Sequence, residues 1–280
     1  GAQDMQRANQ TLGSAMSLAI CVGVILFLIS LISLEQLIIL LGASQEILPF
    51  SVEYLGIILS GAPLIVLAVS CNQIVRAEGS AGISMFAMIT GAGGNILLDW
   101  WFIMGLDMGV RGAAIATVVS RGGALLVLAT YLFSGKSALK ITARNMKPWG
   151  KVAGEIIKLG SVQILRQAGQ SILIVVINHQ LGRYGTNLHI AAYGILNRVM
   201  MFGFMPLAGI VQGFQPIAGY NFGAKKYDRV RKSVQLTSII ASIESVAFFL
   251  PMVIIPVQIL TIFTLDLELL TIGSAALPIV

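Results

Sequence analysis

The sequence predicts an all-α membrane protein in which several helices cross the bilayer. Of its 280 residues, 56% are hydrophobic and only 11% are charged, whereas a soluble domain carries about 25% charged residues. Apolar runs of roughly 20 residues recur along the chain, and each is long enough to cross a hydrocarbon core of about 30 Å as a helix. These runs are continuous and do not alternate, which argues against the strands of a membrane β-barrel.

Charged residues, glycines and prolines divide the chain into seven predicted spans and the start of an eighth. The ranges are 12–34, 48–75, 81–104, 111–134, 156–181, 188–220 and 232–263, with the eighth beginning near 268. Five prolines fall inside these ranges, where each should free a carbonyl and bend its helix. They are Pro63, Pro206, Pro216, Pro251 and Pro256.

The basic residues predict the orientation in the membrane. When alternate loops are assigned to opposite faces, one face holds only Arg111 and Arg183. The other face holds Arg7, Arg76, Lys136, Lys140, Arg144, Lys147, Lys151, Lys158, Lys225, Lys226, Arg229, Arg231 and Lys232. By the positive-inside rule this second face is cytoplasmic, so the linker 136–155 and the loop 222–231 should be cytoplasmic. The net charge of +6 therefore reflects topology, and we expect lipid and no nucleic acid as a partner.

An internal repeat is predicted by sliding the chain over itself by 222 positions. Without a gap, this register pairs Arg7 with Arg229, Gln36 with Gln258 and Glu46 with Glu268. A parallel duplication of this size implies a parent of about 440 residues and twelve helices, with roughly two N-terminal and two to three C-terminal helices outside this chain. The predicted domains are the remainder of an N-terminal six-helix lobe (1–135), a cytoplasmic linker (136–155) and part of a C-terminal lobe (156–280).

Five short motifs, in their order and spacing, resemble the multidrug and toxic compound extrusion (MATE) transporters over nearly the whole chain. They are Arg76–Gly79 (RAEG), Asn95–Asp99 (NILLD), Gly112–Thr117 (GAAIAT), Gln212–Pro216 (QGFQP) and Gly219–Ala224 (GYNFGA). The resemblance implies two lobes around a central cavity, in a multi-pass protein of the cytoplasmic (inner) membrane. It also implies export of amphipathic or cationic drugs in exchange for Na⁺ or H⁺, by rocking of the lobes and without another cofactor.

Asp99 is the first candidate for the coupling site. Asn95 and Asp99 are four residues apart and share one helix face, and a carboxylate in mid-membrane costs at least a few kcal/mol without partners or water. Thr117 lies on the following antiparallel helix, in a small-residue stretch that permits close approach. Together these oxygens suit Na⁺, the one metal ion expected, and the carboxylate alone could carry a proton. The resemblance implies the same three ligands, completed by an acid on the missing first helix. The alternative is that Asn95 and Asp99 only cap or bridge helices.

Glu244 is the other acid well inside a predicted span. Together with Arg198 it is a candidate for a cavity or coupling role, and the alternative for Glu244 is a structural partner for an intramembrane arginine. Arg121, Arg166 and Arg198 must face protein or water, and neutralising Asp99 or Glu244 is the role we favour for them.

Three features bear on other functions. Gly91, Gly93 and Gly94 lack the lysine of a phosphate-binding loop and predict close helix packing or helix bending. The Met- and Phe-rich run 200–205 predicts an adaptable apolar wall or a lipid-facing surface. The paired Ser/His or His/Asp groups of an intramembrane enzyme are not evident, so no enzyme is expected.

The nearest alternative function is that of a flippase for lipid-linked oligosaccharides, from the same superfamily, whose cavity should be richer in arginine. A channel is a further alternative, although no pore motif is evident. The protein is expected to act as a monomer.

Overall fold

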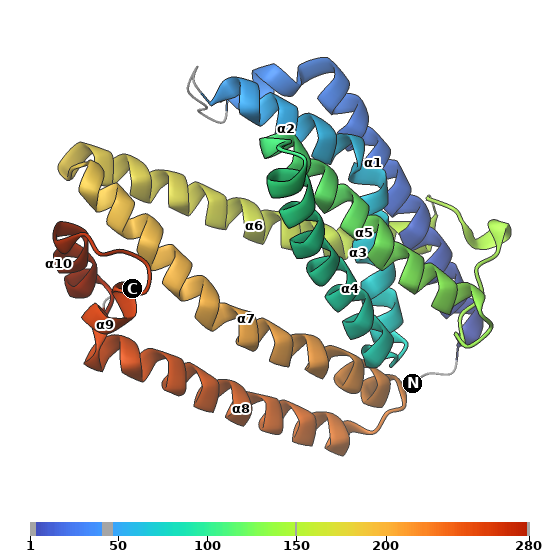
Figure 1. The fold of residues 1–280 in the computed structure, drawn as a ribbon. Coiled ribbons are helices and arrows are strands. Elements are labelled where there is room, and N and C mark those ends of the chain that lie inside the picture. The colour runs from blue at the N-terminus through green and yellow to red at the C-terminus, as the bar shows by residue number, and fades with distance from the viewer. Residues whose placement is uncertain (1–3, 41–46, 149, 279–280) are drawn as a thin grey trace. The chain divides into compact units, whose positions relative to one another are not determined.

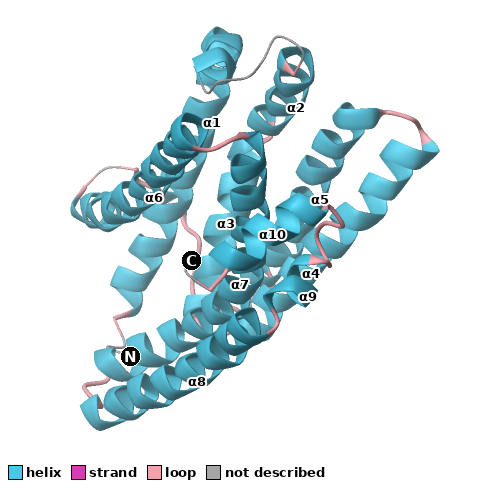
Figure 2. Cartoon of the chain, turned by 90° about the vertical axis from the view of Figure 1, so that its left-hand side faces the viewer, coloured by secondary structure: helices cyan, strands magenta, loops and turns pink. Residues whose placement is uncertain are grey.

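The computed structural model describes residues 4–40, 47–148 and 150–278, and within these ranges the chain is helical without any strand (Figures 1 and 2). The all-α prediction is therefore confirmed. The α-helices are α1 (Met5–Leu40), α2 (Leu48–Ser60), α3 (Ala62–Ala77), α4 (Ala81–Asp99), α5 (Gly109–Phe133), α6 (Lys151–Tyr184), α7 (Asn187–Gly223), α8 (Tyr227–Ile254), α9 (Pro256–Leu260) and α10 (Leu267–Ala276). A π-helix, η1 (Trp100–Gly105), extends α4, and a short 3₁₀-helix, η2 (Ala143–Asn145), precedes α6.

The membrane spans agree with those predicted from the sequence. Six helices in the described part are long and apolar enough to cross a bilayer, and α2 with α3 makes a seventh if the pair is one bent span. The short apolar helix α10 begins where the eighth span was expected. Most helices extend a few residues beyond their predicted ends.

The predicted span 48–75 is bent by 56° between α2 and α3, which confirms the bend expected from Pro63. Pro63 lies in the first turn of α3, where a proline is tolerated because that N–H has no helical acceptor. Gly61 sits at the bend, and a Cβ there would lie 2.7 Å from both methyl groups of Val118. The bend therefore brings the backbone close to α5, and only glycine leaves room for it.

Among the other prolines, Pro256 begins α9 after a break at Ile255, whereas α7 continues as one helix through Pro206 and Pro216. A proline inside an apolar run thus marks a break at two positions and is accommodated within the helix at others.

The chain divides into two compact units, Gln3–Lys158 and Leu159–Val280. In the first unit, α1 packs on α3, α3 on α5 and α4 on α5. Their core is a cluster of buried residues from these four helices: Leu12, Met16, Cys71, Val75, Ala87, Leu128 and Leu132. At Gly23 the backbones of α1 and α3 touch, since a Cβ there would lie 2.3 Å from the Cα of Pro63.

In the second unit, α7 and α8 form an antiparallel hairpin and lie side by side (Figure 1). A Cβ on Gly203 of α7 would lie 2.0 Å from the ring of Phe248 on α8, so the aromatic side chain fills the space that the glycine leaves. The core is formed by Leu196, Val199, Met252, Leu260, Leu270 and Leu277. By contrast, no residue in the most apolar window of α6 is buried within the described chain.

The backbone supports the register of the predicted repeat. Helix α1 begins at Met5 and α8 at Tyr227, which are 222 positions apart. Ser33 interrupts α1 with φ −140° and ψ 20°, and Ile255, again 222 positions later, separates α8 from α9 with φ −130° and ψ 50°. The glutamate match at position 46 lies outside the described residues, and the parallel direction of the two copies stays a prediction.

The contact between α1 and α3 predicts a steric effect of Gly23→Ala. The added methyl group meets the Pro63 backbone, which cannot rotate away as a side chain could, so we expect a loss of about 1–3 kcal/mol and a lower Tm in detergent. Gly82→Ala is the matched control, because nothing lies within 4 Å of a Cβ there, and a helical alanine is intrinsically favourable. Equal Tm values for the two variants would contradict this packing.

The charge distribution predicts the side on which the linker lies. In a variant lacking Cys21 and Cys71, we expect Lys147→Cys to react with an impermeant maleimide only after cells are permeabilised. Leu265→Cys lies in a loop assigned to the outside and is 84% exposed, so it should react in intact cells. The reverse labelling pattern would show that the chain has the opposite orientation in the membrane and would contradict the predicted topology.

Candidate cation site

Helix α4 separates its large apolar residues from its small and polar ones. Ile96, Leu97 and Trp100 are 69–70% exposed, whereas Asn95 and Asp99 are half-buried. In a bilayer the exposed apolar face suits lipid. The spacing of four residues thus turns both polar side chains toward the inside of the unit.

Small residues hold α4 against α5 at this level. A Cβ on Gly91 would lie 3.3 Å from the Cβ of Ala124, and one on Gly94 would lie 3.8 Å from the Cβ of Ser120. Gly93 has nothing within 4 Å of its Cβ position, so close packing was predicted correctly for two of the three glycines. The short separation of the helices brings α5 within reach of Asn95.

Asn95 and Thr117 meet across this helix pair. The Asn95 Nδ2 group lies 3.5 Å from Thr117 Oγ1, at the long limit of a hydrogen bond. Thr117 Oγ1 donates its own proton to the Ala113 carbonyl at 3.0 Å, so its lone pairs remain as acceptors. Because rotation of an amide by 180° exchanges its oxygen and nitrogen, Asn95 can present an oxygen at the same place.

Asp99 carries the unusual feature of this site. Its Oδ1 atom is buried and has no hydrogen-bond partner in the described chain. An unsatisfied buried polar atom costs about 1–3 kcal/mol, and more when it is charged. Arg121, which was expected as a neutralising partner, is exposed and leaves this oxygen unbonded. A bound proton or a hard cation would remove the cost.

Two features next to the site were missed from the sequence. Directly after Asp99, the helix widens into η1, where the Leu106 N–H donates to the Trp101 carbonyl at 3.0 Å. Such π-helical turns are frequent at functional sites, but no sequence pattern indicates one here. Ser120 is buried and donates to the Thr117 carbonyl at 3.0 Å, and its position three residues after Thr117 could have suggested it.

Glu244 and Arg198 do not meet in the hairpin of α7 and α8. Glu244 is half-buried and lies one turn before Phe248, whereas Arg198 is exposed and lies five residues before Gly203. Because Gly203 faces Phe248 in an antiparallel pair, the two charged residues are roughly 13 Å apart along the helix axes. A role for either residue in a cavity or in coupling stays a prediction.

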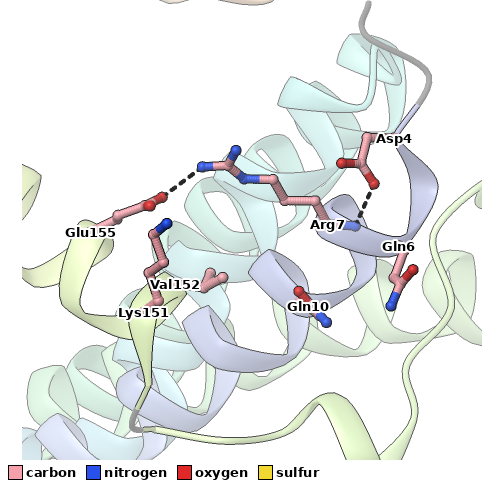
Figure 3. A pocket seen from close by; sticks show the side chains of 7 residues that line it. All are labelled: Asp4, Gln6, Arg7, Gln10, Lys151, Val152 and Glu155. Carbon is pink, nitrogen blue, oxygen red and sulfur yellow. Dashed lines mark hydrogen bonds and ion pairs between the residues drawn. The ribbon is translucent and has the colours of Figure 1, made fainter.

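A shallow cavity of about 340 Å³ lies at the starts of α1 and α6, away from Asp99 (Figure 3). Within it, Arg7 Nη2 contacts Glu155 Oε2 at 2.8 Å, and Asp4 Oδ1 accepts the Arg7 backbone N–H at 2.9 Å. The two side chains of the ion pair are 63% and 43% exposed, so the pair adds little stability. These charges compensate each other, and the cavity offers no counterpart to the unpaired oxygen of Asp99.

No group of three or more His, Cys, Asp or Glu side chains in the described ranges is arranged to hold a metal ion. The predicted ligands Asp99, Asn95 and Thr117 would offer the oxygens of one carboxylate, one amide and one hydroxyl group. Such a set fits a hard cation and not a transition metal.

The family of the chain follows from comparison with known proteins. The MatE family model matches residues 1–101 and 163–280. The chain belongs to the MATE transporter family. This confirms the resemblance: four of the five motifs lie within the matched residues, and Gly112–Thr117 lies between the two matched ranges.

Among curated MATE relatives, the multidrug export protein MepA of Staphylococcus aureus (strain MSSA476) is 32% identical over 226 residues, which cover 81% of this chain and 50% of MepA. MepA of Staphylococcus saprophyticus is 31% identical with the same coverage. The chain therefore spans about half the length of the curated relatives it matches.

Solved MATE structures share the fold. The MATE multidrug transporter DinF-BH, solved in complex with a small molecule, matches with a TM-score of 0.89 and 35% identity, over 99% of this chain and 62% of DinF-BH. An outward-facing MATE transporter of the MOP superfamily matches with a TM-score of 0.91 and 27% identity, over 99% of this chain and 62% of the other.

The unpaired oxygen predicts that Asp99→Asn does not destabilise the protein. At pH 8 without Na⁺, removal of the charge should raise the Tm in detergent by a few degrees, since a buried unbonded charge costs more than 1–3 kcal/mol. Asp107→Asn is the matched control, because that carboxylate is exposed and its loss should leave the Tm unchanged. A clear fall in Tm for Asp99→Asn would mean that the carboxylate has a stabilising structural partner.

Proposed function

We propose that this MATE chain is part of a multi-pass exporter in the cytoplasmic membrane that expels drugs in exchange for a cation. The observation that supports it best is the buried, unbonded Oδ1 of Asp99 beside Asn95 and Thr117. The MepA relatives are multidrug export proteins, and the multidrug transporter DinF-BH was solved in complex with a small molecule. These relatives make amphipathic or cationic drugs the first substrates to test.

In this proposal Na⁺ or H⁺ enters at Asp99. Either ion neutralises the carboxylate, and Na⁺ would also draw on the oxygens of Asn95 and Thr117. Because α4 and α5 touch through Gly91 and Gly94, a change of charge at Asp99 acts on the packing of this helix pair. Coupling requires the cation and the drug to favour different states of the transporter, since a ligand shifts an equilibrium only through its differential affinity.

The drug side of the exchange is assigned to the Met- and Phe-rich run of α7. Met201, Phe202, Phe204 and Met205 are 56–61% exposed within this chain. Methionine adapts its shape to different apolar molecules, and an aromatic face attracts a cation by about 0.5–2 kcal/mol. Glu244, half-buried on α8, is the acid that could contribute to a cationic drug site.

Asp99→Asn tests the coupling role in the full-length transporter. In proteoliposomes, the wild type should expel a cationic dye when an inward Na⁺ or H⁺ gradient is imposed. The variant should lose at least 90% of this gradient-driven export, since it keeps the shape and lacks the charge. Thr117→Val should retain part of it, because one of three oxygen donors is lost. Unchanged export by Asp99→Asn, with the control Asp107→Asn also active, would exclude Asp99 as the coupling carboxylate.

The coupling ion can be identified on the same proteins. If Na⁺ is bound, the wild-type Tm should rise with Na⁺ at fixed pH, following the binding linkage, and the Asp99→Asn protein should not respond. If the proton is the coupling ion, only a pH gradient will drive export. Transport of a lipid-linked oligosaccharide without any drug export would support the flippase alternative.

A further inference from the structure

The segment between α5 and α6 is packed onto the first unit over residues 136–145, which we term the strap (Figure 1). Leu139 and Ile141 pack against the hydrophobic cluster shared by α1, α3, α4 and α5. A Cβ on Gly13 of α1 would lie 2.3 Å from the Asn145 carbonyl oxygen, so the strap backbone touches α1. The strap is therefore packed as part of this unit and is not a flexible linker.

The end of α3 directs Glu78 toward the strap. Gly79 adopts φ 100°, and its N–H donates to the Arg76 carbonyl at 3.0 Å, while the Ser80 N–H donates to Val75 at 3.1 Å. This is the paired bonding of a Schellman motif, which needs a left-handed residue after the helix and therefore favours glycine. The Ser80 hydroxyl lies 2.6 Å from the Tyr131 hydroxyl and ties the turn to α5. Glu78, the last residue before the turn, is thereby fixed in place.

Glu78 holds the strap through its carboxylate. The Ser137 hydroxyl lies 3.0 Å from both carboxylate oxygens, and the Ala138 backbone N–H donates to Oε1. Two residues further on, the Lys140 N–H donates to Asn9 Oδ1 at 2.8 Å. Hydrogen bonds to an ionised carboxylate are about twice as strong as neutral ones. Glu78 therefore anchors the start of the strap, and Asn9 anchors its middle.

We infer that Glu78 is a positioning residue of the transporter, which acts by keeping the strap on the first unit. A free chain of ten residues could extend to roughly 33 Å, whereas the anchored strap has a fixed course. The start of α6 follows the strap and belongs to the same unit as far as Lys158. Glu78 thus determines where the chain enters α6. The effect on transport rests on the proposed function, but the anchoring itself does not.

Limited proteolysis tests the anchoring on the full-length protein in detergent, where membrane sidedness plays no part. Trypsin can cut the strap after Lys136, Lys140 and Arg144, and cleavage requires local opening. Glu78→Ala removes the acceptor of both bonds and should accelerate strap cleavage roughly tenfold. Glu78→Gln keeps one carbonyl acceptor and should fall between Ala and wild type. Cleavage at the basic residues 225–232, in the turn before α8 and in its first turns, is the internal reference and should not change.

A double-mutant cycle separates the Glu78–Ser137 contact from a general loosening. Ser137→Ala alone should accelerate strap cleavage about threefold. Added to Glu78→Ala it should have a clearly smaller effect, because the acceptor of the Ser137 hydroxyl is already gone and only the bond from the Leu139 N–H to Ser137 Oγ, at 3.1 Å, is still lost. Glu53→Gln, at an exposed acid on α2, is the matched control and should behave as wild type. Wild-type strap cleavage in Glu78→Ala, or equal acceleration at residues 225–232, would overturn the anchoring.

Transport kinetics test the positioning role. If the strap acts on the motion of the transporter and not on drug binding, Glu78→Ala should lower the maximal export rate several-fold and leave the half-saturating drug concentration unchanged. Faster strap cleavage with an unchanged maximal rate would show that the anchoring is only structural and would overturn the role. If the wild type exports no drug, the proposed function fails while proteolysis still decides whether Glu78 holds the strap.

Discussion

Polar groups inside membrane-spanning helices must find their partners within the protein, because hydrocarbon offers none. The contact of α3 with α4 follows from this requirement. Arg76 Nη2 donates to Asn72 Oδ1 at 2.9 Å, and its Nε donates to the buried Ser84 hydroxyl at 3.2 Å. Ser84 in turn donates to Asn72 Oδ1 at 2.9 Å, and Asn72 Nδ2 donates to the Ser84 carbonyl at 3.0 Å. This network places α4 on α3, and the rest of α4, up to Asp99, is positioned from it.

Close packing then determines what the polar side chains can reach. Lipid tails are as apolar as leucine, so helices in a membrane gain stability mainly from tight contact and internal hydrogen bonds. Gly23 lets α1 reach Pro63, and Gly91 lets α4 reach α5. Only with α4 and α5 this close do the short side chains of Asn95 and Thr117 come within 3.5 Å. The glycines therefore control the geometry of the candidate site, although they carry no chemistry.

The sequence was sufficient for the spans and for the placement of Asn95 and Asp99 on one helix face, because apolar runs and a spacing of four are local properties. Pro63 also predicted the bend between α2 and α3. The sequence did not show that α7 continues as one helix through Pro206 and Pro216, because the response of a helix to a proline depends on tertiary contacts. The sequence predicted that Arg121 neutralises a carboxylate, but its side chain is exposed. A sequence shows that an intramembrane charge needs a partner, but it does not show which residue lies close enough to be that partner. The strap was read only as a linker, because the acceptor that holds Ser137 is 59 residues away on Glu78.

Among the described residues Asp99 is the exception to the rule that buried polar groups find partners within the protein, and the proposed coupling role rests on that exception. The guanidinium of Arg76 is bonded to groups on two helices, so a second ligand would have to replace those contacts and would gain little. Asp99 Oδ1 has no such bond in the described chain, so a proton or a cation gains the whole interaction with it. A polar group whose hydrogen bonds are already complete gains little free energy when an ion binds, so ion binding at that group can shift a conformational equilibrium only slightly. In the proposed exchange, the cost of burying this unbonded oxygen would supply part of the free energy with which a cation binds at Asp99.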